Sequence, residues 1–181
     1  MRIALLGDIH ANLPALEAVL DHAHEKQVEA IWNVGDVVGY GAFPNLVIKT
    51  LKRENIISVA GNYDCKVLKF EKKQEKWRKK KRPEKFLAFQ WTYHTLSSKN
   101  RHFLQKLPRQ KTLHCEGWQI HLTHGSPASI SEHLLPDTPN KRFQELATQT
   151  DADVVICGHS HLPFLRKVAG VYFINTGSVG R

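Results

Sequence analysis

The pattern of apolar and polar positions in the first third of the chain predicts alternating strands and helices. Apolar runs at 2–6, 30–34 and 56–60 have the length of buried strands, and each runs into a glycine and then a polar residue. Between these runs, apolar side chains recur at helical spacing over 13–25 and 44–54. This order predicts a parallel sheet with right-handed crossovers, and therefore an α/β fold.

Residues 65–107 interrupt this alternation with a long helical stretch. Its first part is strongly basic, Pro83 starts a second helix, and a short third helix ends before Pro108. A helical excursion of this length between sheet strands is suited to a cap beside a functional site.

The last part of the chain returns to strands. Residues 111–115 and 118–123 alternate apolar and polar side chains around Glu116-Gly117, which is the pattern of a β-hairpin. The remaining elements are expected to be a helix at 140–150, a buried strand at 153–157, and strands at 163–168 and 171–174 that flank Ala169-Gly170.

Length and composition restrict the class of protein. A chain of 181 residues, of which 41% are hydrophobic, is expected to form one domain, 1–181, with a sizeable core. No apolar run approaches the roughly 18 residues of a membrane span, and the N-terminus lacks the pattern of a signal peptide. The odd number and wide spacing of Cys65, Cys115 and Cys157 predict reduced thiols and a cytoplasmic location.

The net charge of +9 is concentrated in one segment. Residues 66–85, from Lys66 to Lys85, contain eleven Lys and Arg against three Glu, which leaves a net charge of only +1 on the rest of the chain. Two interpretations stay open. The segment is either a solvated helix or a positive lip that attracts a nucleotide, a dinucleoside polyphosphate or nucleic acid. In the second case Trp77, the single aromatic residue between Lys72 and Arg82, can stack on a base.

Polar side chains that can bind metal follow five of the predicted strands. They are two carboxylates, one amide and four imidazoles: Asp8, His10, Asp36, Asn62, His124, His159 and His161. In open α/β sheets, ligands bind at the carboxyl ends of the strands. Oxygen and nitrogen ligands without thiolate favour Mn²⁺, Fe, Zn²⁺, Co²⁺ or Ni²⁺. Seven groups are more than one ion with an open position takes, which predicts two ions about 3.5–4 Å apart that share a carboxylate.

The loop around Asp36 is rich in glycine. Gly35, Gly39 and Gly41 let the chain turn sharply without a Cβ clash, and beside two cations they are also expected to let the backbone pass close to the ions. Tyr40, in the same loop, is expected either to line a substrate pocket or to pack under the loop.

The other histidines are interpreted as ordinary surface or core residues. They are His22, His24, His94, His102, His114, His121 and His133. Among them His133 stands apart, because it lies in a loop not far downstream of His124.

In these strand-end motifs the chain resembles the calcineurin-like metallophosphoesterases. The motifs follow the order of that family from end to end: Asp8-Ile9-His10, Gly35-Asp36, Gly61-Asn62-Tyr63-Asp64, His124-Gly125 and Gly158-His159-Ser160-His161. The stretch from Gly35 to Gly41 and the closing Asn175-Thr176-Gly177-Ser178 are similar to the small bacterial and archaeal phosphodiesterase-like branch.

The resemblance implies a four-layer sandwich of two mixed β-sheets flanked by helices. It also implies two divalent ions, one held by Asp8, His10 and His161 and the other by Asn62, His124 and His159, with Asp36 bridging them. In that family a metal-bridging hydroxide attacks phosphorus in line. The resemblance places Asn62, Tyr63, Asp64 and His124 among the catalytic residues.

Two departures from the family pattern change the expected chemistry. Many members have a histidine after the asparagine, where it helps to protonate the leaving oxygen, and this chain has Tyr63. Because a phenol with a pKa of about 10 is a poor proton donor at neutral pH, we expect diesters and other good leaving groups to be preferred over alkyl monoesters. Asp64 has the family position that orients this donor, so its role changes as well.

The second departure is at the C-terminus, where relatives usually continue with further strands of the second sheet. The chain is therefore expected either to be truncated or to have a smaller outer sheet. Missing strands would leave an exposed edge that pairs with another chain, which predicts dimerisation, a homo-oligomer, or instability.

Several functions are compatible with the resemblance. The first is a dinuclear metal-dependent phosphodiesterase acting on a phosphorylated small molecule or a nucleotide. The alternatives are a phosphomonoesterase, a protein phosphatase or a nuclease, and a non-catalytic scaffold on the same fold. Scaffold members of the family have lost metal ligands, whereas all seven expected ligands are present here, which favours an enzyme.

Overall fold

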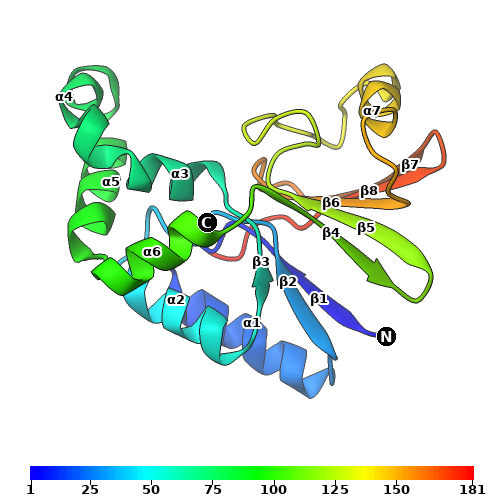
Figure 1. Ribbon diagram of the computed structural model, residues 1–181, viewed down its shortest axis with the longest axis horizontal. Coiled ribbons are helices and arrows are strands. Elements are labelled where there is room, and N and C mark those ends of the chain that lie inside the picture. Colours follow the sequence, from blue (N-terminus) through cyan, green and yellow to red (C-terminus); the bar gives the residue numbers. More distant parts are fainter.

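A computed structural model describes all residues, 1–181, as four layers (Figure 1). Helices α1 (Leu13–Glu25) and α2 (Pro44–Arg53) cover one face of a first sheet. A second sheet packs on the other face of the first, and α7 (Asn140–Ala147) covers the outer face of the second sheet. The predicted sandwich of two sheets flanked by helices is confirmed.

The first sheet consists of three parallel strands in the order β1 (Ile3–Leu6), β2 (Ala30–Asn33) and β3 (Ile57–Ser58). The parallel arrangement is as predicted from the strand–helix order, so this sheet is not mixed. The third strand is shorter than the predicted 56–60. The Val59 amide still donates to Asn33, but the Ala60 amide donates to Pro108, so the chain leaves the ladder there.

The second sheet is mixed, with five strands in the order β4-β5-β6-β8-β7. Their bounds are β4 (Gln110–Cys115), β5 (Trp118–Thr123), β6 (Val154–Cys157), β7 (Phe164–Val168) and β8 (Val171–Asn175). Both predicted hairpins form, and the turn residues Glu116 and Gly117 have φ of 49° and 82°, the left-handed values of a two-residue hairpin turn. The last strand, β8, lies between β6 and β7, so β4 and β7 are the edge strands of this sheet.

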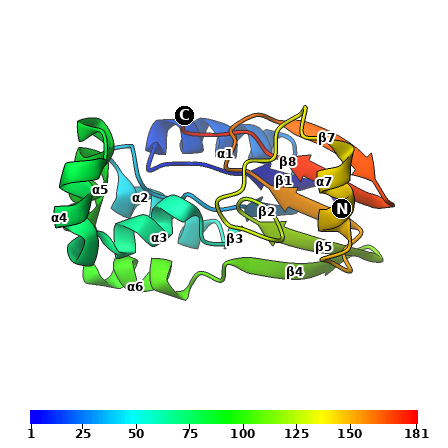
Figure 2. The ribbon, with the colours of Figure 1, turned by 90° about the horizontal axis from the view of Figure 1, so that it is seen from above.

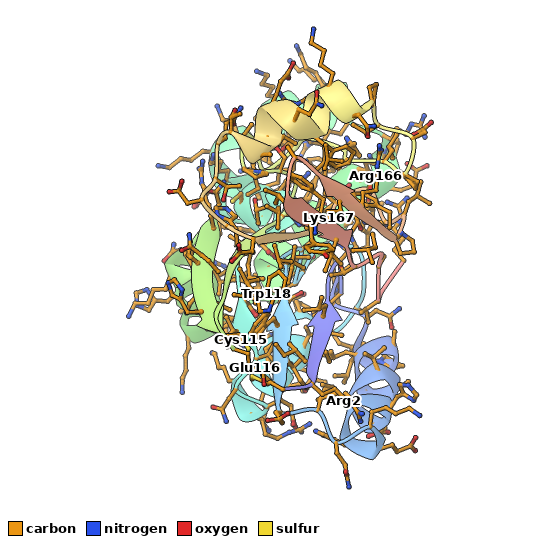
Figure 3. All side chains as sticks on the ribbon, turned by 90° about the vertical axis from the view of Figure 1, so that its right-hand side faces the viewer. Arg2, Cys115, Glu116, Trp118, Arg166 and Lys167 are labelled. Carbon is orange, nitrogen blue, oxygen red and sulfur yellow. The ribbon has the colours of Figure 1, made fainter.

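Apolar side chains hold the two sheets together. Trp32 and Val34 from the first sheet pack in one cluster with Ile120, Leu122 and Ile156 from the second. Full burial of one such side chain stabilises the fold by about 1.5–3 kcal/mol. The N-terminal ammonium pairs with Glu116 in the β4–β5 turn, at the end of the molecule far from residues 62–106; Figure 3 shows this end, with Glu116 labelled.

The predicted helical segment 65–107 is present and starts three residues earlier. It comprises α3 (Asn62–Leu68), α4 (Phe70–Lys80), α5 (Pro83–Thr95) and α6 (Ser98–Lys106), which together form the left side of Figure 1 and of the view from above in Figure 2. The earlier start has a local cause, since the Asp64 carboxylate accepts the free amide of Gly61 at 2.8 Å and so caps the helix. No helix of the protein has both the length and the apolar character needed to cross a bilayer.

Candidate active site

The side chains predicted to bind metal stand on strained backbone just beyond the strands. Five of the seven residues have positive φ, between 50° and 65°: Asp8, His10, Asp36, His159 and His161. Residues other than glycine adopt this conformation only where their surroundings hold it. Here hydrogen bonds do so, because the Asp8 amide donates to Gly35 at 3.0 Å and the His10 amide donates to Asp36 at 2.8 Å.

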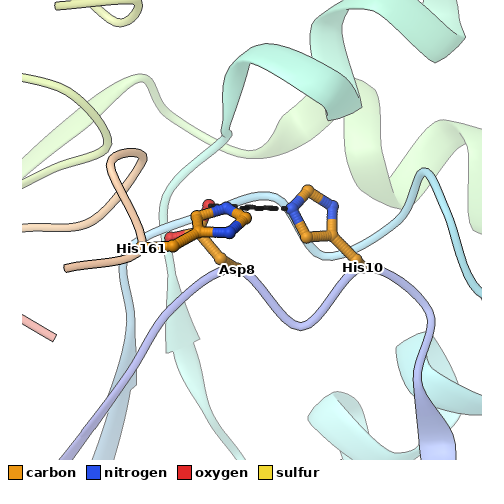
Figure 4. A group of neighbouring side chains, drawn as sticks. All are labelled: Asp8, His10 and His161. Carbon is orange, nitrogen blue, oxygen red and sulfur yellow. Dashed lines mark hydrogen bonds and ion pairs between the residues drawn. The ribbon is translucent and has the colours of Figure 1, made fainter. Parts of the chain in front are cut away.

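One group of ligand atoms comes from Asp8, His10 and His161 (Figure 4). The His161 Nε2 atom lies 3.0 Å from Asp8 Oδ1 and 3.3 Å from His10 Nε2. Asp8 and His10 are buried, whereas the His161 side chain is 23% exposed. The other carboxylate oxygen of Asp8 accepts the His159 amide at 2.9 Å, which links this group to the second one.

The second group comes from Asp36, His124 and His159. The His124 Nδ1 atom donates to the Val34 carbonyl at 2.9 Å, which fixes the tautomer of the neutral ring, so that Nε2 is the nitrogen available to an ion once it has lost its proton. That Nε2 atom lies 3.3 Å from Asp36 Oδ2, and the same oxygen is 3.8 Å from His10 Nε2. Asp36 therefore faces both groups.

Asn62 lies beside the second group, with Nδ2 3.1 Å from His159 Nδ1. Its Oδ1 atom is buried and has no hydrogen-bond partner, and the same holds for His124 Nε2. An unpaired buried polar atom costs about 1–3 kcal/mol. Two such acceptors next to carboxylates and imidazoles fit a site for cations that prefer oxygen and nitrogen ligands.

The electrostatics of the second group reflect the close contact between acid and imidazole. Burial lowers the pKa of His124, but the Asp36 carboxylate outweighs burial and raises that pKa to about 9. For His159, burial acts together with the neighbouring His124 and His133 imidazoles and lowers the pKa to about 4. Burial raises the pKa of Asp36, yet His124 and His10 hold it below its ordinary value.

The glycines near Asp36 allow two loops to approach each other more closely than a Cβ atom would permit. Gly35 has φ of 103°, and a Cβ atom there would lie 2.6 Å from the Gly61 nitrogen. A Cβ atom on Gly61 would lie 2.1 Å from Asp36 Oδ1. The close approach that requires glycine is therefore between two loops of the protein.

Tyr63 lines the active-site cavity, and both Tyr63 and Asp64 are held by hydrogen bonds within the protein. The Tyr63 amide donates to Asp36 Oδ1 at 2.6 Å, and its hydroxyl is hydrogen-bonded to the hydroxyl of Tyr40. Burial and the Tyr40 hydroxyl raise the pKa of Tyr63 above its ordinary value. The Asp64 carboxylate accepts three backbone amides, from Gly61, Val37 and Val38, so it positions the Asp36 loop.

The ligand groups open onto a cavity of about 510 Å³. Tyr40 lines it, with its ring 4.9 Å from that of His10. His133, which the sequence pattern assigned to the ordinary histidines, also lines it, with its ring 4.1 Å from that of His159. The cavity includes further residues for which no site role was predicted individually: Lys66, Lys85, Ser131, Ser160 and Arg181. The sequence gave a signal for His133, through its position in the loop after His124, and for Lys66 and Lys85, as members of the basic segment.

The basic segment reaches this cavity through two residues, Lys66 and Lys85. Most of its other lysines and arginines are exposed on α4. Trp77 is packed, with its ring 5.4 Å from that of Phe89 and with the Lys81 ammonium 4.9 Å from its centre. It is therefore not placed to stack on a base.

A model of the calcineurin-like phosphoesterase superfamily domain matches residues 1–181. The chain belongs to this family. Among calcineurin-like phosphoesterases and related proteins, it is 33% identical to an uncharacterized protein of Methanocaldococcus jannaschii, an alignment that covers 99% of this chain and 76% of the relative. It is 26% identical to the phosphodiesterase YfcE of Escherichia coli, over 99% of this chain and 79% of that protein.

The fold of this family member is also found in solved structures. A protein of Pyrococcus horikoshii superposes with a TM-score of 0.88 at 21% identity, over 98% of this chain and 76% of that one. At this identity the similarity concerns the fold, and it agrees with the two-sheet sandwich described above.

Proposed function

We propose that this protein is a dinuclear metal-dependent phosphoesterase that hydrolyses phosphodiesters. The observation that carries the proposal is the position of Asp36 between two groups of ligand atoms, with its Oδ2 atom 3.3 Å from His124 Nε2 and 3.8 Å from His10 Nε2. A carboxylate in this position can bridge two ions, which is the arrangement that supports in-line displacement at phosphorus.

The residues divide into two ligand sets with a shared member. Asp8, His10 and His161 would hold one ion, and Asn62, His124 and His159 the other. When bound, the ions supply Lewis acidity and lower the pKa of a coordinated water.

The protein's own residues orient this arrangement. The Val34 carbonyl fixes the tautomer of His124. The Asp64 carboxylate accepts hydrogen bonds from the backbone amides of Val37 and Val38, and these bonds hold the Asp36 loop in place. The Tyr63 amide binds Asp36 Oδ1 and leaves Oδ2 directed at the imidazoles.

The preference for diesters with a good leaving group is supported by the environment of Tyr63. Its hydroxyl is bonded to Tyr40 and its pKa is raised, so it is a weaker proton donor than an isolated phenol. An ester whose leaving oxygen is stable as an anion does not need this proton. The Escherichia coli relative bears the name of a phosphodiesterase, in agreement with this preference.

The test is hydrolysis of bis(p-nitrophenyl) phosphate by protein reconstituted with Mn²⁺, compared with protein treated with a chelator. Asp36→Asn keeps the size of the side chain and is expected to lower kcat/KM at least about 100-fold, because it removes the shared ligand charge. Asp21→Asn, at an exposed position on α1, is the matched control and should be unchanged. Wild-type rates in Asp36→Asn would overturn the proposal.

A further inference from the structure

Two lysines of the helical segment line the active-site cavity. Lys66 belongs to α3 and Lys85 to α5, so the packing of two helices brings them to one place. No carboxylate oxygen lies within 4.0 Å of either nitrogen. Two like charges side by side without an acidic partner form a site that an anion would stabilise.

Lys66 is held in a defined position. It is half-buried, and its Nζ atom lies 4.8 Å from the centre of the Tyr63 ring. Burial lowers the pKa of Lys66, the Asp36 carboxylate raises it, and Lys85 and Lys81 lower it further. Lys66, Asp36 and Asn62 line the same cavity, so the lysine shares this surface with two of the candidate ligand residues.

The rest of the cavity lining has different chemistry. Ser131, His133 and Ser160 carry no permanent charge, and Arg181 is the one further lysine or arginine that lines the cavity. The helical segment therefore contributes its positive charge to the cavity through Lys66 and Lys85. A substrate with negative charge on one side of its reacting phosphorus can direct that charge toward these two lysines.

We propose that Lys66 and Lys85 form a second anion subsite that binds a phosphate leaving group, so that the preferred substrates are phosphoric anhydrides of the nucleoside polyphosphate class. This inference rests on the proposed function. In such a hydrolysis the oxygen of water forms a bond to the attacked phosphorus, and the bond from that phosphorus to the bridging oxygen breaks. The electron pair stays on the bridging oxygen, both products carry phosphate, and the proton of the water passes to solvent.

The subsite accounts for the absence of a proton donor at position 63. A phosphate leaving group departs as a stable anion. Fixed positive charges can therefore stabilise the charge on its leaving oxygen, which in an alkyl ester requires proton transfer. Tyr63 then supports Lys66 through its ring, while its hydroxyl stays bonded to Tyr40.

The test compares two substrates in Mn²⁺-loaded protein: diadenosine triphosphate, which has a phosphate leaving group, and bis(p-nitrophenyl) phosphate, which has none. In Lys66→Met and Lys85→Met, the loss of kcat/KM on the anhydride is expected to exceed the loss on the aryl diester by about tenfold for each substitution. Lys72→Met and Lys79→Met, at exposed positions on α4 outside the cavity, are the matched controls and should change neither rate.

Several outcomes would overturn the inference. They are equal losses on both substrates, no loss on either, and a wild-type protein that hydrolyses only the aryl diester. Each of these leaves the proposed function intact, because the diester is still cleaved in a metal-dependent way. Failure of the proposed function looks different, since the wild-type protein would then cleave neither substrate whether Mn²⁺ or the chelator is present.

Discussion

The two sheets contribute different kinds of ligand to the same site. Loops after the first sheet supply every oxygen ligand, from Asp8, Asp36 and Asn62, together with one imidazole, His10. Loops after the second sheet supply only imidazoles. Each group of ligand atoms draws on both sheets, so neither half of the molecule holds a complete set. Bound ions would therefore add to the apolar packing and to the hydrogen bonds, such as that from the His159 amide to Asp8, that join the two halves.

The largest effect should come from removing a ligand from either sheet. Asp36→Asn is expected to weaken the binding of both ions, whereas His161→Gln should remove one, and each should lower kcat at least about 100-fold. Metal content per chain, measured by elemental analysis after dialysis, checks this difference. His22→Gln changes an exposed histidine and is the control. Loss of a single ion in both ligand variants would show that Asp36 is not shared.

A smaller effect should appear in the pH dependence of metal binding. In the metal-free protein the pKa of His124 is about 9, so up to that pH an ion must displace a proton. The apparent affinity is therefore expected to rise by up to about tenfold per pH unit between pH 7 and 9, and to level off above pH 9. His159, with its pKa lowered to about 4, is already neutral and adds no dependence in this range.

Calorimetric titration with Mn²⁺ at pH 7, 8 and 9 measures this dependence. If the affinity for Mn²⁺ were the same at these three pH values, protonation of His124 next to Asp36 would not be what opposes metal binding.

The coupling between the two sheets should also be visible in thermal stability. A ligand at 100 times its Kd stabilises the folded state by about 2.7 kcal/mol, which corresponds to a rise in Tm of about 5–10 °C per site for a chain of this size. Thermal unfolding with Mn²⁺ and with chelator gives the comparison. Ca²⁺, which prefers oxygen ligands throughout, is the control cation and should give a smaller shift.

The variant His161→Gln separates the contributions of the two sites to this stabilisation. Only one ligand group is damaged, so the variant should keep roughly half of the wild-type shift in Tm. A full shift in this variant would mean that only one of the two ligand groups binds an ion.

The smallest effect is expected from substitution of Tyr63, which stands where many family members have a proton-donating histidine. Tyr63→His is expected to raise kcat on glycerol phosphate, an alkyl monoester, by at most about tenfold, because an imidazolium protonates the leaving oxygen more readily than a phenol. Tyr63→Phe is the matched control and should give no gain. An unchanged rate in Tyr63→His would contradict the link between this position and the choice of leaving group.

The parts of the site that could be predicted from sequence are those fixed by local chain geometry. A strand that ends in glycine and a polar residue places that residue at the sheet edge, which is why seven candidate ligand residues could be named from the sequence. The parallel order of the first sheet followed from the strand–helix alternation. The structure confirmed both hairpins in the same way, because two-residue turns have a strong local signature.

The rest depends on tertiary packing and could not be predicted in this way. Lys66 and Lys85 are nineteen positions apart and meet only because α3 packs on α5. His133 reaches His159 through a loop whose path is set by its contacts. Trp77 was a candidate for base stacking, but its ring packs against Phe89 instead. The separation of α3 from the basic helix α4 was likewise not evident from charge alone.

The left-handed backbone at five of the ligand residues has a consequence for protein design. Grafting Asp8, His10, Asp36, His159 and His161 onto an idealised scaffold would not reproduce the site, because idealised strands and loops avoid positive φ at residues other than glycine. A designer would have to transplant the loops as well, including the hydrogen bonds that keep them in this conformation. In this protein the conformation of the main chain determines the geometry of the site as much as the identity of the side chains does.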